Sequence, residues 1–312
     1  MWGTRVVTSV MVGVLLAGTV ACGEQDDAEA RSPSSPARPS PSATTEGDGP
    51  MVPDLPDLSE LPSATPTATK PAGRTFGADV SWPQCPKGMG IPEKRTEGMP
   101  MPTKAAEFVI IGLTNGPSFV ANPCLASQLD WVKERHLMAS AYSVVSYPDD
   151  DAVARLRDEG PFRGDTRLGA LRNVGYQAAM FNVATMKQVG FRTPVVWVDV
   201  EPVNHFEWSD DVVANAAVVH GTMRGYRDAG FRIGFYSIGS LWERVVGSLR
   251  FGAPEWRPAG ERGLREALAR CGDDWSFQGG KAVLGQWVED RRDRNVTCPG
   301  AMPDLAEWFQ QY

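Results

Sequence analysis

The apolar residues beyond residue 74 follow two periods that alternate along the chain. Short runs rich in β-branched and aromatic residues predict strands, and longer runs with apolar residues three and four positions apart predict helices. The predicted strands cover residues 76–81, 107–114, 138–145, 194–201, 233–237 and 282–288. The predicted helices cover residues 125–136, 168–189, 210–229, 261–270 and 303–310. Strands that alternate with helices favour βα units and a parallel sheet.

Residues at the ends of the predicted helices support these boundaries. Gly190 and Gly230 each follow a helix, where a left-handed C-terminal cap belongs. Ser209 is expected to cap the 210–229 helix, with Asp210 and Asp211 in its first turn, where acids suit the helix dipole. The segment 74–312 is close to the ~250 residues of a single barrel. We therefore predict an α/β fold with one irregular (β/α) TIM-type barrel.

The strand at 194–201 places two carboxylates in an apolar setting. Side chains alternate along a strand, so Trp197, Asp199 and Glu201 share one face and three valines share the other. An unpaired buried carboxylate is expensive, and the carboxyl end of a barrel strand is where active sites lie. We interpret Asp199 and Glu201 as candidate catalytic residues.

The first residues predict export. Arg5 precedes an apolar run at 6–21 that is short for a membrane span, and Thr19-Val-Ala-Cys22 follows. This ending resembles a bacterial lipobox, which implies a signal peptide over 1–22 and a lipid anchor on Cys22 at the outer face of the cytoplasmic membrane. Thr19 replaces the usual Leu, so plain secretion is the alternative. Residues 23–73 are rich in Pro, Ser and Thr and predict a disordered tether.

Composition and cysteine usage narrow the class further. The 312-residue chain has 42% hydrophobic residues and a net charge of -7, which gives no basic footprint for nucleic acid. An even number of remaining cysteines in an exported chain predicts disulfides. We expect Cys85–Cys124 and Cys271–Cys298, because each pair would join neighbouring loops, although the sequence does not fix the connectivity. Their spacing and the scattered histidines predict no metal site, and no cofactor is expected.

Several motifs, in order along the chain, resemble glycoside hydrolase family 25, the muramidase-type lysozymes. Asp79-Val-Ser-Trp-Pro-Gln84 is similar to the signature of that family's first strand, and Asp199-Val-Glu201 to its Asp-x-Glu. The other similar segments are Phe108–Gly116 with Asn122, Ala139–Tyr142, Gly234–Ser237, Gln286-Trp287 and Asp293-Arg-Asn295. The resemblance implies a TIM-type barrel that hydrolyses peptidoglycan glycan.

The resemblance also implies roles for individual residues. Glu201 would be the general acid and Asp199 its partner carboxylate, with Asp79 and Asp293 as supporting acids. Asp290 is an alternative to Asp293, because both lie in a charged run that is typical of a solvated loop. The implied substrate-binding residues are Gln84, Tyr142, Tyr236 and Trp287. The expected partner is a polysaccharide bound by a monomer.

Departures from the family pattern keep other functions open. Gly112 and Asn115 lie where the family usually has Lys and Glu, and Ser143 replaces an aromatic residue. One alternative is a non-catalytic glycan-binding or envelope-organising lipoprotein that retains the barrel. Another is a hydrolase of a different polysaccharide. The sequence has no Gly-x-Ser-x-Gly elbow, which disfavours a serine hydrolase. It also has no Gly-x-Gly-x-x-Gly motif after a strand, which disfavours a dinucleotide enzyme.

Overall fold

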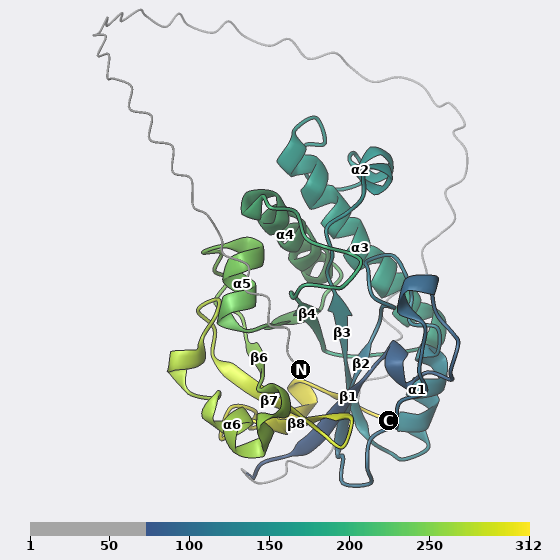
Figure 1. The fold of residues 1–312 in the computed structure, drawn as a ribbon, viewed down its shortest axis with the longest axis vertical. Coiled ribbons are helices and arrows are strands. Elements are labelled where there is room, and N and C mark those ends of the chain that lie inside the picture. The colour runs from purple at the N-terminus through teal and green to yellow at the C-terminus, as the bar shows by residue number, and fades with distance from the viewer. Residues whose placement is uncertain (1–72) are drawn as a thin grey trace, which may run out of the picture. The chain divides into compact units, whose positions relative to one another are not determined.

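The computed structural model describes residues 73–312, which form a closed barrel of eight strands (Figure 1). The strands are β1 Phe76–Val80, β2 Phe108–Gly112, β3 Met138–Val144, β4 Val195–Asp199, β5 Arg232–Tyr236, β6 Glu255–Pro258, β7 Ala282–Glu289 and β8 Arg292–Thr297. β1 to β7 run parallel, whereas β8 is antiparallel to both β7 and β1. The predicted irregular α/β barrel is confirmed, with one reversed strand.

Helices connect most of the parallel strands. They are α1 Leu125–Lys133, α2 Asp150–Leu156, α3 Arg167–Val189, α4 Val212–Asp228, α5 Gly239–Val246 and α6 Gly263–Ala269. α3 and α4 lie side by side against the barrel (Figure 1). The chain between β1 and β2 has only two short 3-10 turns, Trp82–Gln84 and Pro92–Lys94. This region therefore covers the barrel with loop rather than with a helix.

The alternation predicted for the fourth strand is present in β4. Val196, Val198 and Val200 belong to the apolar cluster that includes residues of α1, α3 and α4. Trp197 belongs to the separate cluster that fills the barrel interior. Because consecutive side chains of a strand point to opposite faces, this arrangement turns Asp199 towards the interior as well.

The C-terminal segment closes the amino end of the barrel. The Phe309 ring lies 4.4 Å from the Phe108 ring, and Trp308 stacks on Trp197 at 6.0 Å. β9, Gln310–Gln311, pairs with the start of β3. The predicted helix at 303–310 is wrong: only a 3-10 turn, Leu305–Glu307, forms before the chain extends to bury two consecutive aromatic residues. The carboxyl end of the barrel stays available for a site.

Two other local predictions are corrected. Asp211, not Ser209, caps α4, because its carboxylate accepts hydrogen bonds from the backbone N–H groups of Val213 and Ala214 at 3.0 and 3.1 Å. The charged run around 289–294 is a β-hairpin rather than a loop. Asp290 and Arg291 both have positive φ, 52° and 57°, as the tight turn between β7 and β8 requires.

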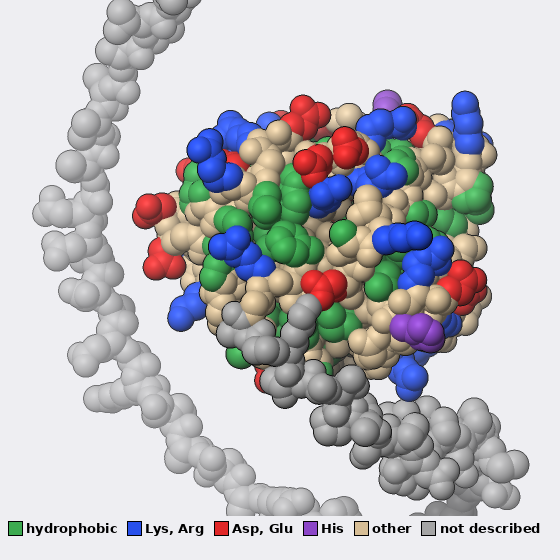
Figure 2. Space-filling view, turned by 90° about the horizontal axis from the view of Figure 1, so that it is seen from below, with side chains coloured by type: hydrophobic (Ala, Val, Ile, Leu, Met, Phe, Trp, Pro, Cys, Tyr) green, Lys and Arg blue, Asp and Glu red, His purple; other side chains and the backbone are tan. Residues whose placement is uncertain are grey.

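The surface carries mixed charge. On the face seen in Figure 2, acidic and basic side chains are interspersed around a group of hydrophobic side chains. Within residues 73–312, no helix has the length and apolar character needed to cross a membrane. The predicted signal peptide with Cys22 and the predicted tether up to residue 72 lie outside the described residues.

Candidate active site

A cavity of about 340 Å³ opens at the carboxyl end of the barrel. Its floor and walls come from the strand ends and from the loops that follow β1 and β4. The predicted site residues that line it are Asp79, Gln84, Tyr142, Asp199, Glu201, Tyr236 and Asp293. The fold thus brings together four carboxylates that are up to 214 positions apart in the numbering, from Asp79 to Asp293 (293 − 79).

Asp293 reaches this end of the barrel because β8 is reversed. It is the second residue of an antiparallel strand, so it lies beside the last residues of the parallel strands. In the β1–β8 pair it is directly opposite Asp79. Side chains at such opposed positions have Cβ atoms roughly 4.5–5.5 Å apart. The reversed strand therefore adds a second acid next to Asp79.

Two buried amides hold the Asp79 carboxylate. Asn295 Nδ2 and Gln286 Nε2 donate to Asp79 Oδ1 at 2.7 and 3.0 Å. The amides are themselves oriented by aromatic donors: Trp256 Nε1 donates to Asn295 Oδ1 at 2.7 Å, and the Tyr236 hydroxyl donates to Gln286 Oε1 at 2.9 Å. Because each amide oxygen is occupied, each NH2 group must face Asp79. The network fixes both the position and the orientation of this carboxylate.

Asp199 and Glu201 come from the end of β4. Asp199 is 3% exposed, and its Oδ1 has no hydrogen-bond partner within the described part of the chain. The Glu201 backbone is held after the strand, because the Trp208 indole N–H donates to its carbonyl oxygen at 3.0 Å. Pro202 follows and cannot extend the ladder. The two acids therefore stand at the edge of the barrel with few groups that satisfy their charge.

Burial and mutual repulsion raise the pKa values of all four acids. Burial, then the charge of Asp293, raises the pKa of Glu201 to about 7, and burial raises that of Asp293 to about 6. The pKa of Asp199 is raised well above its usual range by burial, then by Glu201 and Asp79. The pKa of Asp79 is also raised, by burial and Asp293, although its amide partners oppose the shift. At neutral pH the cavity can hold both a protonated and an ionised carboxyl group.

An aromatic wall lies beside the acids. Tyr142 and Tyr236 meet the Trp256 ring edge-on, with ring centroids 5.9 and 4.6 Å away. Trp82 lines the cavity from the turn after β1. Neither Trp82 nor Trp256 is among the substrate-binding residues that the resemblance implies. The sequence signal for Trp256 is weak, because β6 has only four residues, of which two are charged and one is proline.

Trp287 and Asp290 do not line the cavity. Trp287 is 4% exposed and packs with Ala267 and Val296 in a cluster beside α6. Its neighbour Gln286 points to the cavity instead, since adjacent strand residues face opposite ways. This position does not fit the sugar-platform role implied for Trp287. Asp290 lies in the hairpin turn, so its position does not fit a catalytic role either.

The positions that depart from the family pattern also have local explanations. A side chain on Gly112 would place its Cβ 2.5 Å from Ser81 Cβ and 2.8 Å from the Tyr142 ring. Asn115 accepts from the Ile91 N–H at 2.9 Å. Ser143 Oγ lies 2.8 Å from the Tyr226 hydroxyl, in the layer outside the barrel. None of the three supplies a side chain to the cavity.

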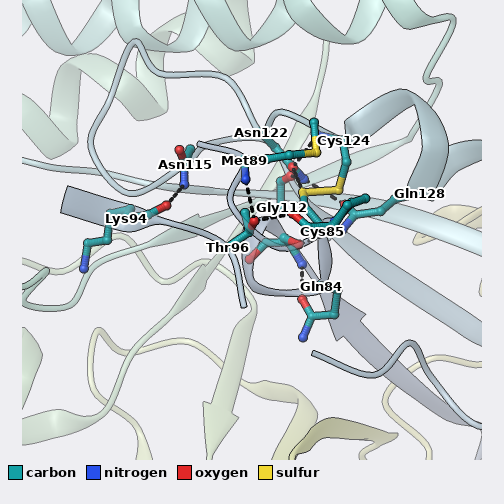
Figure 3. Close-up of a disulfide and its surroundings, with 12 residues drawn as sticks. Gln84, Cys85, Met89, Lys94, Thr96, Gly112, Asn115, Asn122, Cys124 and Gln128 are labelled. Carbon is teal, nitrogen blue, oxygen red and sulfur yellow. Dashed lines mark hydrogen bonds between the residues drawn. A yellow bond between two sulfur atoms is a disulfide. The ribbon is translucent and has the colours of Figure 1, made fainter. Parts of the chain in front are cut away.

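Both predicted disulfides are present. Cys85–Cys124 and Cys271–Cys298 have S–S distances of 2.05 and 2.00 Å. Figure 3 shows the first at the base of the loop that follows Gln84. Two disulfides are consistent with an extracytoplasmic protein. Within residues 73–312, no group of three or more His, Cys, Asp or Glu side chains has the arrangement of a metal site.

Comparison with solved structures finds similar barrels at low sequence identity. The family GH25 lysozyme from Aspergillus fumigatus has a TM-score of 0.45 and 16% identity over 75% of this chain and 99% of that chain. A bacterial lysozyme from Streptomyces coelicolor has a TM-score of 0.46 and 12% identity over 75% and 97%. The modular autolysin LytC from Streptococcus pneumoniae, solved with a synthetic peptidoglycan ligand, has 0.43 and 13%; the match covers 72% of this chain and 46% of LytC. No protein-family model and no curated protein matches the chain.

Proposed function

We propose that residues 74–312 form a glycoside hydrolase that cleaves the glycan of peptidoglycan, with Glu201 as general acid. The observation that carries the proposal is the group of four carboxylates in one cavity, in which the pKa of Glu201 is raised to about 7. Glycosidic cleavage needs a carboxylic acid that is still protonated near neutral pH and a second carboxylate that is ionised. The resemblance of the Asp79 and Asp199-Val-Glu201 motifs to muramidases points to peptidoglycan.

The proposed reaction uses the residues in two half-reactions. Glu201 donates its proton to the glycosidic oxygen as the bond from that oxygen to the anomeric carbon breaks. The developing positive charge at the anomeric carbon is stabilised by Asp199, or the substrate's own acetamido oxygen attacks that carbon. The Glu201 carboxylate then removes a proton from the water that adds to the anomeric carbon. Atoms and charge balance: one water is consumed and Glu201 ends protonated.

The remaining residues have supporting roles in this proposal. Asp293 supplies the neighbouring negative charge that keeps Glu201 protonated, and Asp79, held by Gln286 and Asn295, raises the pKa of Asp199. The rings of Tyr142 and Tyr236, which pack against the buried Trp256, supply apolar surface for pyranose rings. Gln84 Oε1 accepts from the Ser81 N–H at 2.8 Å, which fixes the turn that bounds the cavity.

A non-catalytic glycan-binding role is the second candidate. The observation that favours it concerns two positions that differ from the family pattern. Gly112 has no space for a side chain, and the Asn115 amide group holds a loop. Neither position therefore supplies a charged group to the cavity. A barrel of this kind would bind glycan through the same aromatic wall without turnover.

Incubation with purified peptidoglycan distinguishes the two candidates. The whole chain, with both disulfides formed, is compared with a Glu201→Gln variant, and released fragments are identified by mass spectrometry. Muropeptides with new reducing ends, produced by the wild type and at least about 100-fold less by the variant, are expected. If neither protein releases fragments but both sediment with the glycan, the binding role replaces the hydrolase.

We also propose that Cys22 anchors the protein outside the cytoplasmic membrane. The lipobox-like Thr19-Val-Ala-Cys22 and the predicted tether support an anchored domain held away from the lipid. A Cys22→Ala variant is expected to move from the membrane fraction to the medium. Equal membrane association of the variant and the wild type would contradict the anchor.

A further inference from the structure

The loop after β1 is fastened at several points. Cys85 at its start is joined to Cys124. Within the loop, Thr96 Oγ1 accepts from the Met89 N–H at 2.9 Å and donates to the Pro86 carbonyl oxygen. Arg95 Nη1 donates to two further loop carbonyls at 2.6 and 3.1 Å. Residues 85–98 are thus cross-linked by side chains, and the disulfide holds their first residue, Cys85 (Figure 3).

These contacts hold Lys94 at the cavity. The Lys94 N–H donates to the Ile91 carbonyl at 3.0 Å, and its own carbonyl accepts from Asn115 Nδ2 at 3.2 Å. The Lys94 stem passes close to Gly116, where an added Cβ would lie 3.0 Å from Lys94 Cγ. In Figure 3 the Lys94 side chain extends away from the disulfide and from Asn115. Lys94 is half-buried and lines the cavity that holds the four acids.

The Lys94 ammonium group has no anionic partner within residues 73–312. Among the residues that line the cavity in the described part of the chain, it is the only Lys or Arg. Its Nζ has no ion pair and no hydrogen-bond acceptor within residues 73–312, and it lies 5.9 Å from the centroid of the Trp82 ring. Apart from its contact with the Trp82 ring, the Lys94 ammonium group is therefore open to an anionic ligand.

We infer that Lys94, held beside the Trp82 ring, is a specificity-determining residue that binds a carboxylate carried by the glycan. The inference rests on the proposed glycosidase and names its substrate class: a glycan with a carboxylate near the cleaved linkage. Such a polymer is repelled by ionised acids in the cavity, and a fixed cation at the rim offsets that repulsion. In peptidoglycan the carboxylate has two sources, the lactyl group of muramic acid and the attached peptide.

Equilibrium binding by calorimetry tests the inference without turnover. All proteins carry Glu201→Gln, so that the ligands stay intact. The ligands are oligosaccharides of N-acetylglucosamine and N-acetylmuramic acid with free carboxylates, the same oligosaccharides converted to carboxamides, and peptide-bearing oligosaccharides. The variants are Lys94→Met, which keeps the stem, and Lys94→Arg, which keeps the charge. Lys87→Met, an exposed lysine of the same loop that does not line the cavity, is the matched control.

Lys94→Met is expected to weaken binding of the carboxylate ligand about fivefold and to leave the carboxamide unchanged. Lys94→Arg restores most of the affinity, and Lys87→Met has no effect. A loss on the peptide-bearing ligand, whose lactyl carboxyl is amide-bonded, assigns the carboxylate to the peptide; a loss confined to the free acid assigns it to the sugar.

Two results overturn the inference and are distinguishable. If Lys94→Met lowers the affinity for carboxylate and carboxamide ligands equally, or for neither, Lys94 does not bind the carboxylate. The proposed hydrolase would not be affected by this result. If the parent Glu201→Gln protein binds none of the oligosaccharides, the proposed substrate fails together with the inference. Thermal unfolding of each variant shows whether a loss comes from misfolding.

Discussion

Asp79 and Asp293 face each other across the antiparallel β1–β8 pair, at the only reversed strand of the barrel. Like charges at directly opposed positions of a sheet are destabilising. Two amide groups stabilise the Asp79 carboxylate by donating hydrogen bonds to it. The pKa values of both acids are also raised, so protonation can relieve the repulsion. The pair is therefore maintained against local stability, as is common where acids are gathered for chemistry.

The first prediction is that neutralising Asp293 stabilises the domain at neutral pH. Its pKa is raised to about 6 when folded, so the folded state binds more protons than the unfolded state between about pH 4 and 6. Stability from this group is thus fully present below pH 4 and is lost as the pH rises through 6. Asp293→Asn is expected to increase the free energy of unfolding by roughly 1–3 kcal/mol at pH 7.5 and little at pH 4.

Urea unfolding at the two pH values measures this effect. Asp290→Asn, in the hairpin turn three residues away and outside the cavity, is the matched control and should change stability little at either pH. An Asp293→Asn effect that is equal at both pH values would show that it does not come from the titration of Asp293.

The second prediction concerns the pH dependence of the proposed hydrolysis. Glu201 must be protonated to act as acid, and its pKa is raised to about 7, so kcat/KM should fall as the pH rises above 7. Asp293 is a cause of that raised pKa. In Asp293→Asn the alkaline limb should therefore shift to lower pH by up to about one unit. A limb that stays in place would mean that Asp293 does not control the protonation of Glu201.

The sequence predicted the strands that follow a simple apolar pattern. β2, β4, β5 and β7 have valine, isoleucine or phenylalanine at core positions, β3 has small residues there, and both disulfides were expected. β6 was missed because two of its four residues, Glu255 and Arg257, are charged. In the structure these side chains are only 0% and 2% exposed and form an ion pair at 2.7 Å. β8 was missed because its first residues are charged and its tight turn contains no glycine.

The acids of the candidate site were predicted from the sequence, but the groups that hold them were not. Motifs located the acids, because each lies at a strand end at the carboxyl edge of the barrel. The amide network around Asp79 could not be predicted without knowing that β8 is reversed and pairs with both β1 and β7. The hairpin register also decides that Gln286, and not Trp287, faces the cavity.

The third prediction separates two buried tryptophans of similar exposure. Trp256 is 1% exposed and donates to Asn295 beside Asp79, whereas Trp287 is 4% exposed and packs outside the barrel. Trp256→Phe removes the donor that orients Asn295 and is expected to lower kcat about tenfold, since a lost hydrogen bond of this kind is worth about 1–1.5 kcal/mol. Trp287→Phe should lower the melting temperature while leaving kcat within about twofold. Equal kcat values for the two variants would remove the Asp79 network from the proposed mechanism.

The fourth prediction compares the two disulfides. They enclose 39 and 27 residues, so replacing either pair with serines should lower the free energy of unfolding by about 3–4 kcal/mol in the chain-entropy description. Only Cys85–Cys124 fastens the loop that carries Gln84 and Lys94 to the cavity. Because a mobile loop must be ordered again when substrate binds, the Cys85→Ser/Cys124→Ser variant should also raise KM by about three- to tenfold.

The Cys271→Ser/Cys298→Ser variant is the matched control, since neither of its positions lines the cavity. It should lose similar stability with an unchanged KM, when both variants are assayed well below their melting temperatures on a soluble glycan. Urea unfolding gives the first quantity and steady-state kinetics the second. If both variants raise KM alike, the effect comes from general loosening of the barrel; if neither does, the loop keeps its position at the cavity through the hydrogen bonds of Asn115, Arg95 and Thr96 alone.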